Sequence, residues 1–200
     1  HVKTIQDRVG GAANVALNIA KLGGKVTLVG VIGDDVEGQT LRQLLEAQGV
    51  SCEFVVEKNI KSICTLRVMA QHQQLIRVDF EESPLQFDQE ALSAKLRKRW
   101  PQHKVVIFSD YGKGSLSNVA VHIQAAKAAG LKVLVDPKGT DYKRYDGADV
   151  ITPNLAEFQA VVGVCSNEQD LVEKGRDLLK IHKIAALLLT RGEAGMTLIK

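Results

Sequence analysis

The sequence predicts an α/β fold built on a mostly parallel sheet, and the pattern of its strand ends supports this class. Short apolar runs alternate with segments of helical periodicity along the second half of the chain. Each run ends in polar or glycine-rich residues, whereas its beginning carries no such cluster. Ligands of parallel α/β sheets bind beyond the carboxyl ends of the strands. A ligand-binding edge is therefore expected at the four ends that carry Asp110, Asp136, Asn154 and Thr190.

The composition is that of an ordinary globular protein, with 45% apolar and 24% charged residues, and it predicts one domain over residues 1–200. The 26 basic and 23 acidic residues are spread along the chain, which argues against nucleic-acid binding. The longest apolar run, residues 184–189, is far shorter than the roughly 20 residues of a membrane span. Three widely spaced cysteines indicate reduced thiols in a cytoplasmic protein. We therefore expect neither a nucleic-acid nor a membrane partner.

Near the start of the chain, Gly10 and Gly11 precede a helical pattern over residues 12–22 that is rich in alanine. Two interpretations of this segment are open. The double glycine lets a ligand approach the backbone amides at the positive end of the helix, where Asn14 then binds a hydroxyl group. Alternatively, the glycines form a tight turn and Asn14 is simply exposed.

The next segment is close to a phosphate-binding loop in spacing but not in charge. A strand over residues 26–32 leads into Gly33-Asp34-Asp35-Val36-Glu37-Gly38-Gln39-Thr40, whereas the motif G-x-x-x-x-G-K-[ST] requires lysine in place of Gln39. Three carboxylates in such a loop would repel a triphosphate. We therefore expect the acids to lie near the start of a helix over residues 41–47, where the helix dipole favours them.

The pattern changes to alternation between residues 51 and 80. This change indicates three consecutive antiparallel strands, which form an inserted sheet that serves as a lid over a reaction site or as a dimerisation edge. Arg77 and Asp79 fall on the same face of the last strand. They are candidates for ligand contact, and a surface ion pair explains them equally well.

Residues 132–158 contain the two strand ends that are richest in polar side chains. The strand over residues 133–135 stops at Asp136-Pro137-Lys138-Gly139, and the strand over residues 150–151 stops at Thr152-Pro153-Asn154. Asn154 is placed to cap the helix that follows. This combination of carboxylate, lysine and asparagine suits a phosphorylated ligand.

Five motifs follow one another along the chain: GGAANVA from Gly10, QLIRVDF from Gln74, SDYGKG from Ser109, DPKG from Asp136 and TPNLAEF from Thr152. As an ordered set they resemble the ribokinase-like carbohydrate kinases, and the resemblance covers essentially all 200 residues. Within that family the motifs are most similar to the heptose 7-phosphate kinase domains of bifunctional heptose kinases and adenylyltransferases. The resemblance implies a ribokinase-like three-layer sandwich with a small antiparallel β lid.

The resemblance also implies a reaction, in which ATP with Mg²⁺ phosphorylates the C1 hydroxyl of D-glycero-D-manno-heptose 7-phosphate on the route to ADP-heptose and the lipopolysaccharide core. By family analogy, Asn154 and Glu157 lie at the ATP phosphates and orient Mg²⁺ through its water shell. The implied nucleotide-binding residues are Asn154, Leu155, Ala156, Glu157, Thr190, Arg191 and Gly192. The implied substrate-binding residues are Gly10, Gly11, Asn14, Arg77, Asp110, Lys113, Asp136 and Lys138.

Two family elements are expected outside the chain. The opening strand of the family would precede His1, and the G-A-G-D loop, whose aspartate is the catalytic base, would follow Lys200. Residues 1–200 are therefore expected to be an incomplete kinase domain, truncated at both ends, inactive by itself and prone to aggregate. The resemblance further implies a homodimer through the lid and a fused C-terminal adenylyltransferase domain.

Other functions are open at this point. A ribokinase-like kinase for another sugar phosphate or a nucleoside would keep Asn154 and Glu157 and differ around Asn14, Arg77 and Lys113. A nucleotide- or sugar-binding protein on the same fold would lack the chemistry. A nicotinamide-dependent dehydrogenase is disfavoured because no G-x-G-x-x-G motif follows a strand.

Overall fold

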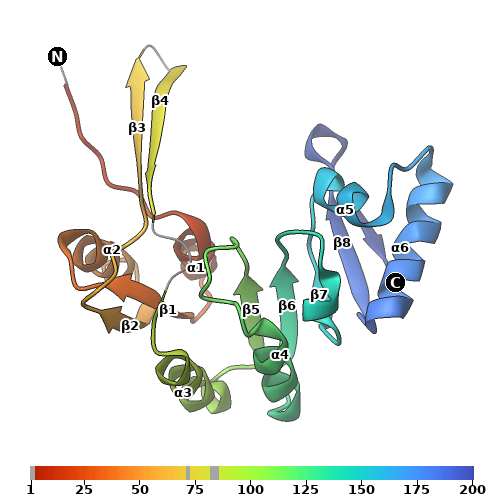
Figure 1. Ribbon diagram of the computed structural model, residues 1–200, viewed down its shortest axis with the longest axis horizontal. Helices are drawn as coiled ribbons and strands as arrows, with labels where there is room; N and C mark the ends of the chain where they lie inside the picture. Colours follow the sequence, from red (N-terminus) through yellow and green to blue (C-terminus); the bar gives the residue numbers. More distant parts are fainter. Residues whose placement is uncertain (1–2, 71–72, 82–85) are drawn as a thin grey trace. The chain divides into compact units, whose positions relative to one another are not determined.

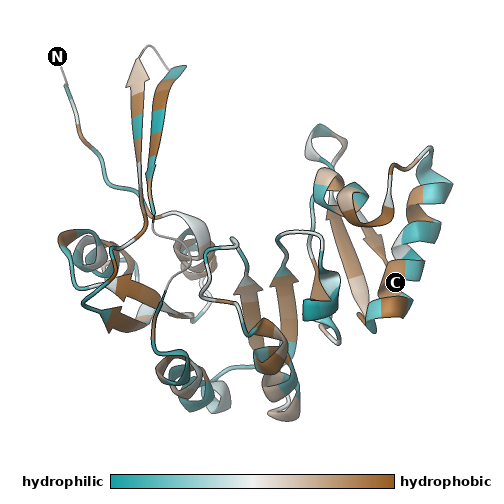
Figure 2. Cartoon of the chain, in the orientation of Figure 1, coloured by the Kyte–Doolittle hydropathy of each residue, from teal (hydrophilic) through white to brown (hydrophobic). Residues whose placement is uncertain are grey.

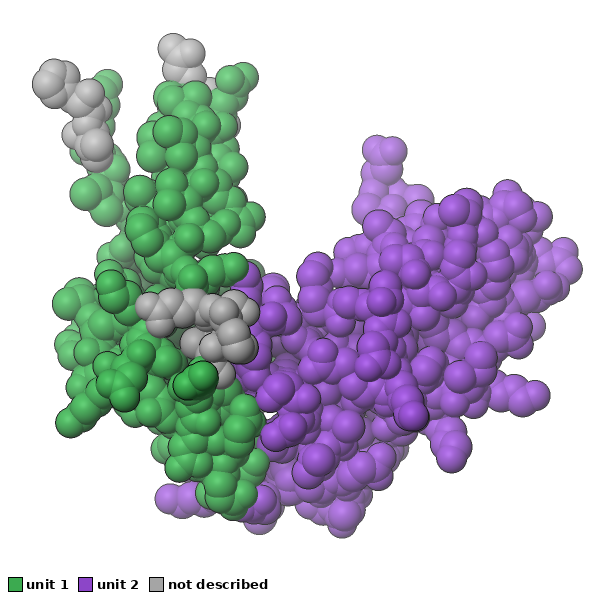
Figure 3. Space-filling view, viewed as in Figure 1, with its two compact units in different colours: residues 1–96 green, residues 97–200 purple. Residues whose placement is uncertain are grey.

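The structure, a computed structural model, describes residues 3–70, 73–81 and 86–200. The chain forms two compact units, His1–Leu96 and Arg97–Lys200, which are green and purple in Figure 3. Each unit has sheet structure and buried apolar side chains of its own. The two units are therefore described separately.

The first unit begins with a helix and a βαβ crossover (Figure 1). Helix α1 (Gly11–Lys21) precedes strand β1 (Thr27–Gly33), helix α2 (Val36–Glu46) and strand β2 (Ser51–Glu57). Strands β1 and β2 pair in parallel, with Thr27 opposite Ser51. The buried apolar cluster that joins these elements consists of Ala13, Ala16, Ile32, Leu45, Val50 and Phe54.

The antiparallel sheet of this unit has two strands, β3 (Cys64–Ala70) and β4 (Gln73–Phe80), and helix α3 (Gln89–Arg99) follows it. This corrects the prediction of three antiparallel strands between residues 51 and 80, because β2 belongs to the parallel pair. Phe54 and Val55 are adjacent and both buried, which is typical of a parallel strand covered on two faces. The helical crossover through α2 also favours the parallel pairing.

The acidic segment after β1 closes on its own chain. Helix α2 begins at Val36, earlier than predicted, because the Asp35 carboxylate accepts the N–H of Gly38 at 2.8 Å and caps the helix. A Cβ atom at Gly38 would lie 2.7 Å from the carbonyl oxygen of Gly33, so glycine is needed for this close approach. The prediction that these acids mark a helix start is confirmed for Asp35.

The second unit is a five-stranded sheet in the order β5-β6-β7-β8-β9, and its apolar strands are brown in Figure 2. The strands are β5 (Val105–Ser109), β6 (Lys132–Asp136), β7 (Val150–Ile151), β8 (Ala186–Thr190) and β9 (Met196–Ile199). The helices between them are α4 (Val119–Ala128), α5 (Leu155–Val162) and α6 (Glu168–His182). Strands β5 to β8 are parallel, and β9 is antiparallel to β8.

The helices of the second unit cover one face of its sheet. Successive parallel strands are neighbours, and crossovers of the usual right hand place their helices on the same side. Gly175 allows α6 to approach β9 closely, since a Cβ there would lie 2.5 Å from a methyl carbon of Ile199. The buried side chains that form the core here include Val133, Val135, Ile151, Leu187, Leu189 and Ile199.

Two elements of the second unit were not predicted. Helix η2 (Tyr142–Tyr145) is a 3₁₀ helix between β6 and β7 whose two tyrosine rings are buried and meet edge to face at 5.9 Å. Strand β9 was missed because its short apolar run becomes a strand only by pairing with β8. The other 3₁₀ helices are η1 (Trp100–Gln102) and η3 (Gly192–Ala194). Of the helices that the structure describes, none has the length and apolar character to cross a membrane.

Candidate active site

The carboxyl ends of β5 to β8 lie at one edge of the second unit's sheet, because these strands are parallel and in sequential order. The N–H of Asp110 donates to the carbonyl of Asp136 at 2.9 Å, and the N–H of Thr190 donates to the carbonyl of Pro153 at 3.0 Å. Asn154 and Thr190 form an isolated parallel bridge. The structure therefore brings together the four strand ends at which the sequence predicted a ligand-binding edge.

The start of α5 is fixed by a reciprocal pair of hydrogen bonds. The side-chain oxygen of Asn154 accepts the N–H of Glu157 at 2.9 Å, and Glu157 Oε2 accepts the N–H of Asn154 at 3.1 Å. This is a capping box, and it confirms that Asn154 caps the helix. Ala156 is exposed in the first turn and Leu155 is half-buried. The backbone N–H groups that remain free in such a turn favour anions.

Carboxylates and a lysine meet between this helix start and the end of β6. The Lys138 ammonium lies 3.2 Å from Glu157 Oε1 in an exposed ion pair, a type worth about 0–1 kcal/mol. Burial, and next the negative charge of Glu157, raise the pKa of Asp136 above its usual value. These oxygen donors are the type that Mg²⁺ prefers. Among the described residues no group of three His, Cys, Asp or Glu side chains is placed to hold a metal ion.

The Asp110 side chain is buried beneath this edge and is fully engaged. Its Oδ2 accepts the hydroxyl proton of Tyr145 at 2.8 Å, and its Oδ1 accepts the N–H of Gly112 at 2.8 Å. A guanidinium nitrogen of Arg144 lies 3.4 Å from the same carboxylate. Lys113 follows in this loop and is half-buried. Sequence reasoning missed Tyr145 and Arg144.

The spacing of the two tyrosines was the available signal for this network. Tyr142 and Tyr145 are three residues apart, which places both rings on the same side of a 3₁₀ turn. They lie between two strand ends that the sequence had already marked as polar. A turn with two large aromatic side chains in that position indicates a buried support for the neighbouring loops.

The loop after β8 is braced by Arg191. Both terminal nitrogens of its guanidinium bond to the carboxylate of Glu168 at the start of α6, and one also donates to the Thr197 hydroxyl at 3.1 Å. Gly192 follows in the exposed turn with φ of 59°. Arg191 is therefore engaged within its own unit, and a position of this loop along a nucleotide stays a prediction.

The remaining predicted residues belong to the first unit. The Gly10 carbonyl accepts the N–H groups of Ala13 and Asn14, Gly11 has φ of 52°, and the Asn14 side chain is exposed one turn into α1. Arg77 and Asp79 lie on one face of the hairpin, as predicted, and form an ion pair at 3.0 Å. The surface ion pair that the sequence allowed is thus present. That these residues share a site with the second unit stays a prediction.

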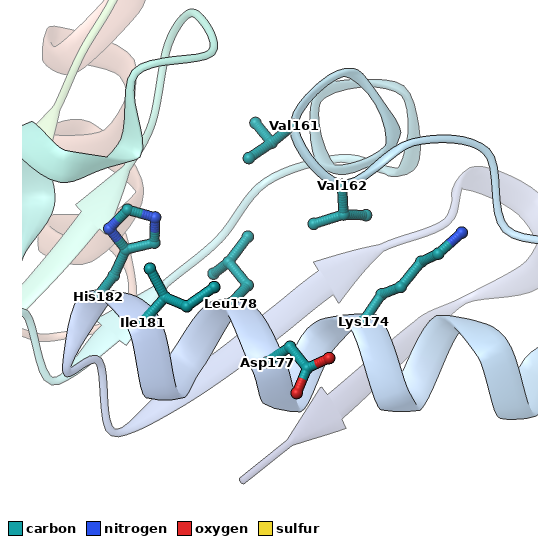
Figure 4. Close-up of a pocket in the computed structure, with 7 residues that line it drawn as sticks. All are labelled: Val161, Val162, Lys174, Asp177, Leu178, Ile181 and His182. Carbon is teal, nitrogen blue, oxygen red and sulfur yellow. The ribbon is translucent and has the colours of Figure 1, made fainter.

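A pocket of about 310 Å³ lies between α5 and α6, away from the predicted residues (Figure 4). Its lining is mostly aliphatic, and its two charged side chains, Lys174 and Asp177, both belong to α6. The Lys174 ammonium donates to the carbonyl of Val164, just after α5, at 2.6 Å. The lining residues are Val161, Val162, Lys174, Asp177, Leu178, Ile181 and His182. Because it lacks the strand-end side chains, we place the candidate active site at the sheet edge and not in this pocket.

Two solved structures of sugar kinases have the same fold as this chain. A ribokinase from Giardia lamblia has a TM-score of 0.81 at 16% identity, and the match covers 99% of this chain and 69% of that one. Phosphofructokinase-2 from Escherichia coli has a TM-score of 0.78 at 20% identity, covering 96% of this chain and 64% of the other. The predicted ribokinase-like α/β fold is thereby confirmed.

The chain belongs to the pfkB family of carbohydrate kinases, whose family model matches residues 1–200. The bifunctional protein HldE of Pseudomonas syringae pv. tomato is 52% identical over 199 residues, and that of Haemophilus influenzae Rd is 48% identical. Both matches cover 100% of this chain and 42% of the relative's length. The resemblance drawn from the five motifs is confirmed. Membership of a sugar kinase family implies a nucleotide and a divalent metal ion as cofactors.

Proposed function

We propose that this chain is part of a kinase that transfers a phosphoryl group from ATP to the C1 hydroxyl of D-glycero-D-manno-heptose 7-phosphate, in ADP-heptose and lipopolysaccharide core synthesis. The observation that carries the proposal is identity of 48–52% over the whole chain to HldE proteins. Structural likeness to other sugar kinases supports the fold but not this choice of sugar. The choice of heptose 7-phosphate as the substrate rests on the motifs that resemble those of heptose kinases.

The sheet edge of the second unit has the chemistry for the nucleotide side of this reaction. Asn154 and Glu157, fixed by their capping box, would hold Mg²⁺ through water, and Lys138 would face the transferred phosphoryl group. When bound, Mg²⁺ neutralises charge on the phosphate oxygens. The first turn of α5, with Leu155 and Ala156, would receive the ATP phosphates. Thr190, Arg191 and Gly192 would lie along the nucleotide.

The hairpin of the first unit supports an anionic sugar. Arg67 and Arg77 stand directly opposite each other across β3 and β4, a placement in which like charges destabilise a sheet. Arg77 is paired with Asp79, and Arg67 donates to the side chain of Gln74 at 2.8 Å. A bound sugar phosphate would relieve the repulsion that remains. We therefore assign Arg77 to the substrate, together with Gly10, Gly11, Asn14, Asp110, Lys113, Asp136 and Lys138.

The other face of the same hairpin supports a homodimer. It is an apolar surface made by Cys64, Leu66, Val68, Ile76, Val78 and Phe80, in which Leu66, Ile76 and Phe80 are more than half exposed. A two-stranded sheet is marginally stable alone, and an apolar face of this kind marks an interaction surface. A second copy of the chain is the occupant we propose, since closed two-fold dimers are the commonest assemblies.

Dimerisation is tested by one substitution on each face of the hairpin. In the full-length protein, Leu66→Lys should shift the sedimentation coefficient towards that of a monomer, because a charge enters the apolar contact. The matched control, Arg67→Lys, places the same side chain on the opposite face and should leave the dimer intact. A monomeric wild type, or equal effects of both variants, would remove the hairpin as the dimer interface.

The whole protein is proposed to carry a C-terminal adenylyltransferase domain and to be cytoplasmic. The chain spans 42% of the length of its HldE relatives, whose printed name calls them bifunctional. The catalytic base is proposed to lie beyond Lys200, as in the family to which the motifs are similar. Kinase activity is therefore to be measured on the full-length protein.

Phosphorus NMR of the full-length protein with ATP, Mg²⁺ and D-glycero-D-manno-heptose 7-phosphate tests the function. A new anomeric phosphate signal that grows with ADP is the expected result. The matched control is the same sugar phosphate without its C1 hydroxyl, which should leave ATP intact. If ATP is consumed only with another sugar phosphate, the protein is a kinase for that sugar and the proposed substrate is wrong. If ATP binds but no sugar is phosphorylated, a binding protein on this fold is favoured.

A further inference from the structure

The hydroxyl of Tyr145 connects two loops of the candidate active site. It donates to Asp110 Oδ2 at 2.8 Å and accepts the backbone N–H of Lys138 at 3.1 Å. Asp110 follows β5 and Lys138 follows the neighbouring strand β6. Burial raises the pKa of the Tyr145 phenol above its usual value, so the hydroxyl keeps its proton and remains a donor. Because the ring is completely buried, the position of this hydroxyl is fixed by the core.

The Asp110 carboxylate is held in place by donors of its own unit. Its side chain is 5% exposed, and both carboxylate oxygens already have donors within the unit. A buried carboxylate that has lost one donor is costly, so each partner constrains the others. The N–H of Gly112 is one of these donors, which ties the turn before Lys113 to this carboxylate.

Arg144 extends the same network along the loop after β5. Its Nη2 donates to the carbonyl of Leu116 at 2.6 Å and lies 3.4 Å from Asp110 Oδ2. The guanidinium also lies over the Tyr145 ring, 5.5 Å from its centre. The loop that carries Lys113 is therefore held on both sides by residues of η2.

We propose that Tyr145 is a positioning residue for phosphoryl transfer, which holds Lys113 and Lys138 at the reacting phosphate by joining their loops through Asp110. This role rests on the proposed kinase function. The two loops are close, since a Cβ at Gly112 would lie 3.6 Å from Cγ of Lys138. A displacement of about 1 Å in such groups lowers catalysis by up to about 100-fold.

Tyr142 provides a matched control on the same helix. Its ring is 1% exposed, and its hydroxyl has no hydrogen-bond partner in the described part of the chain. Tyr142→Phe and Tyr145→Phe each remove one buried hydroxyl and leave the ring in place. Only Tyr145→Phe breaks bonds to Asp110 and Lys138, whereas loss of an unpaired hydroxyl is close to neutral.

Hydrogen exchange of the full-length protein measures how firmly Tyr145 holds the two loops, and it requires no catalytic activity. In Tyr145→Phe the amides of residues 110–116 and 138–141 should exchange about tenfold faster, because one hydrogen bond to a charged acceptor is lost. Asp110→Asn should give the same pattern from the other end of the bond. Tyr142→Phe should match the wild type. Unchanged exchange rates in both Tyr145→Phe and Asp110→Asn would refute the claim that Tyr145 joins the two loops through Asp110.

Steady-state kinetics of the full-length protein measure whether the loss of these hydrogen bonds slows phosphoryl transfer. Tyr145→Phe should lower kcat about 10- to 100-fold and change KM for ATP by less than about threefold, because alignment in the transition state is lost before ground-state binding. Tyr142→Phe should keep both constants. Faster exchange with an unchanged kcat would overturn the positioning role. If the wild type phosphorylates no sugar, the proposed function fails, and hydrogen exchange still decides whether Tyr145 joins the two loops.

Discussion

Replacement of Asp35 by alanine should destabilise the first unit, because it removes three hydrogen bonds at once. The Asp35 carboxylate accepts the N–H of Gly38 at 2.8 Å, and it accepts both the N–H and the hydroxyl of Ser62 at 2.7 Å. Ser62 is buried, and its hydroxyl in turn accepts the N–H of Gly33 at 3.0 Å. One side chain thus joins the end of β1, the start of α2 and the segment before β3.

The expected loss follows from these contacts. The helix cap contributes about 1 kcal/mol, and the two bonds from Ser62 contribute about 0.5–1.5 kcal/mol each. We therefore expect Asp35→Ala to lower the free energy of unfolding by about 2–4 kcal/mol at neutral pH. Asp34→Ala is the matched control, because Asp34 is adjacent and exposed, and it should change stability by less than about 0.5 kcal/mol.

The dependence on pH has a definite sign. Burial acts to raise the pKa of Asp35, but hydrogen bonds from Ser62 and Gly38 outweigh it, and the pKa lies below the usual value of an aspartate. A carboxyl group with a lowered folded-state pKa stabilises above its unfolded pKa, and the stabilisation is lost as pH falls through the folded value. The difference between wild type and Asp35→Ala should therefore narrow as the pH falls below the usual aspartate pKa of about 3.9.

The assay must report on the first unit. Trp100 and the three tyrosines all follow residue 96, so intrinsic fluorescence reports on the other unit. Hydrogen exchange of peptides that cover residues 31–46 and 60–64, together with urea unfolding followed by circular dichroism, measures the right region. Equal stability of Asp35→Ala and Asp34→Ala would refute the reasoning, as would a difference that grows towards acid pH.

Two further predictions concern the sheet edge of the second unit. Since the pKa of Asp136 is raised, its ionised carboxylate opposes folding once the pH rises through the folded-state pKa. Asp136→Asn should therefore raise the urea midpoint of unfolding at neutral pH, and this gain should disappear near pH 3.8. Trp100 fluorescence during urea unfolding measures the midpoint, and a lower stability of Asp136→Asn at neutral pH would contradict the prediction. In the full-length protein, the double variant Asn154→Ala with Glu157→Ala should raise KM for ATP with Mg²⁺ at least about tenfold and leave KM for the sugar unchanged. Unchanged turnover and nucleotide affinity would remove both residues from the site.

Local sequence was sufficient to predict the parallel strands of the second unit. Strands β6 and β8 end at Asp136 and Thr190, each within one residue of the end predicted from the sequence. The prediction succeeds because buried parallel strands are continuous apolar runs that polar residues terminate. Asn154 was recognisable as a cap because the capping box is confined to four consecutive residues. From parallel strands in sequential order it follows that their carboxyl ends share one edge.

Pairing and burial over longer distances were decided by the tertiary structure. β2 has the residues of an alternating strand, but the crossover through α2 makes it a parallel partner of β1. β9 is a strand only because β8 lies beside it. The bonds from Tyr145 to Asp110 and from Ser62 to Asp35 join residues 35 and 27 positions apart, so no local pattern reveals them.

The sequence by itself therefore determined the family, the order of the elements and the polar strand ends, since these depend on motifs and short-range periodicity. The tertiary structure decided which strand pairs with which, and which polar side chains are anchors and which remain accessible. The physical reason is that a hydrogen bond between distant residues forms only when the core has already placed both partners. Asp110 and Asp136 look equivalent in the sequence, yet the first accepts a hydrogen bond from the buried Tyr145 hydroxyl and the second lies near the carboxylate of Glu157.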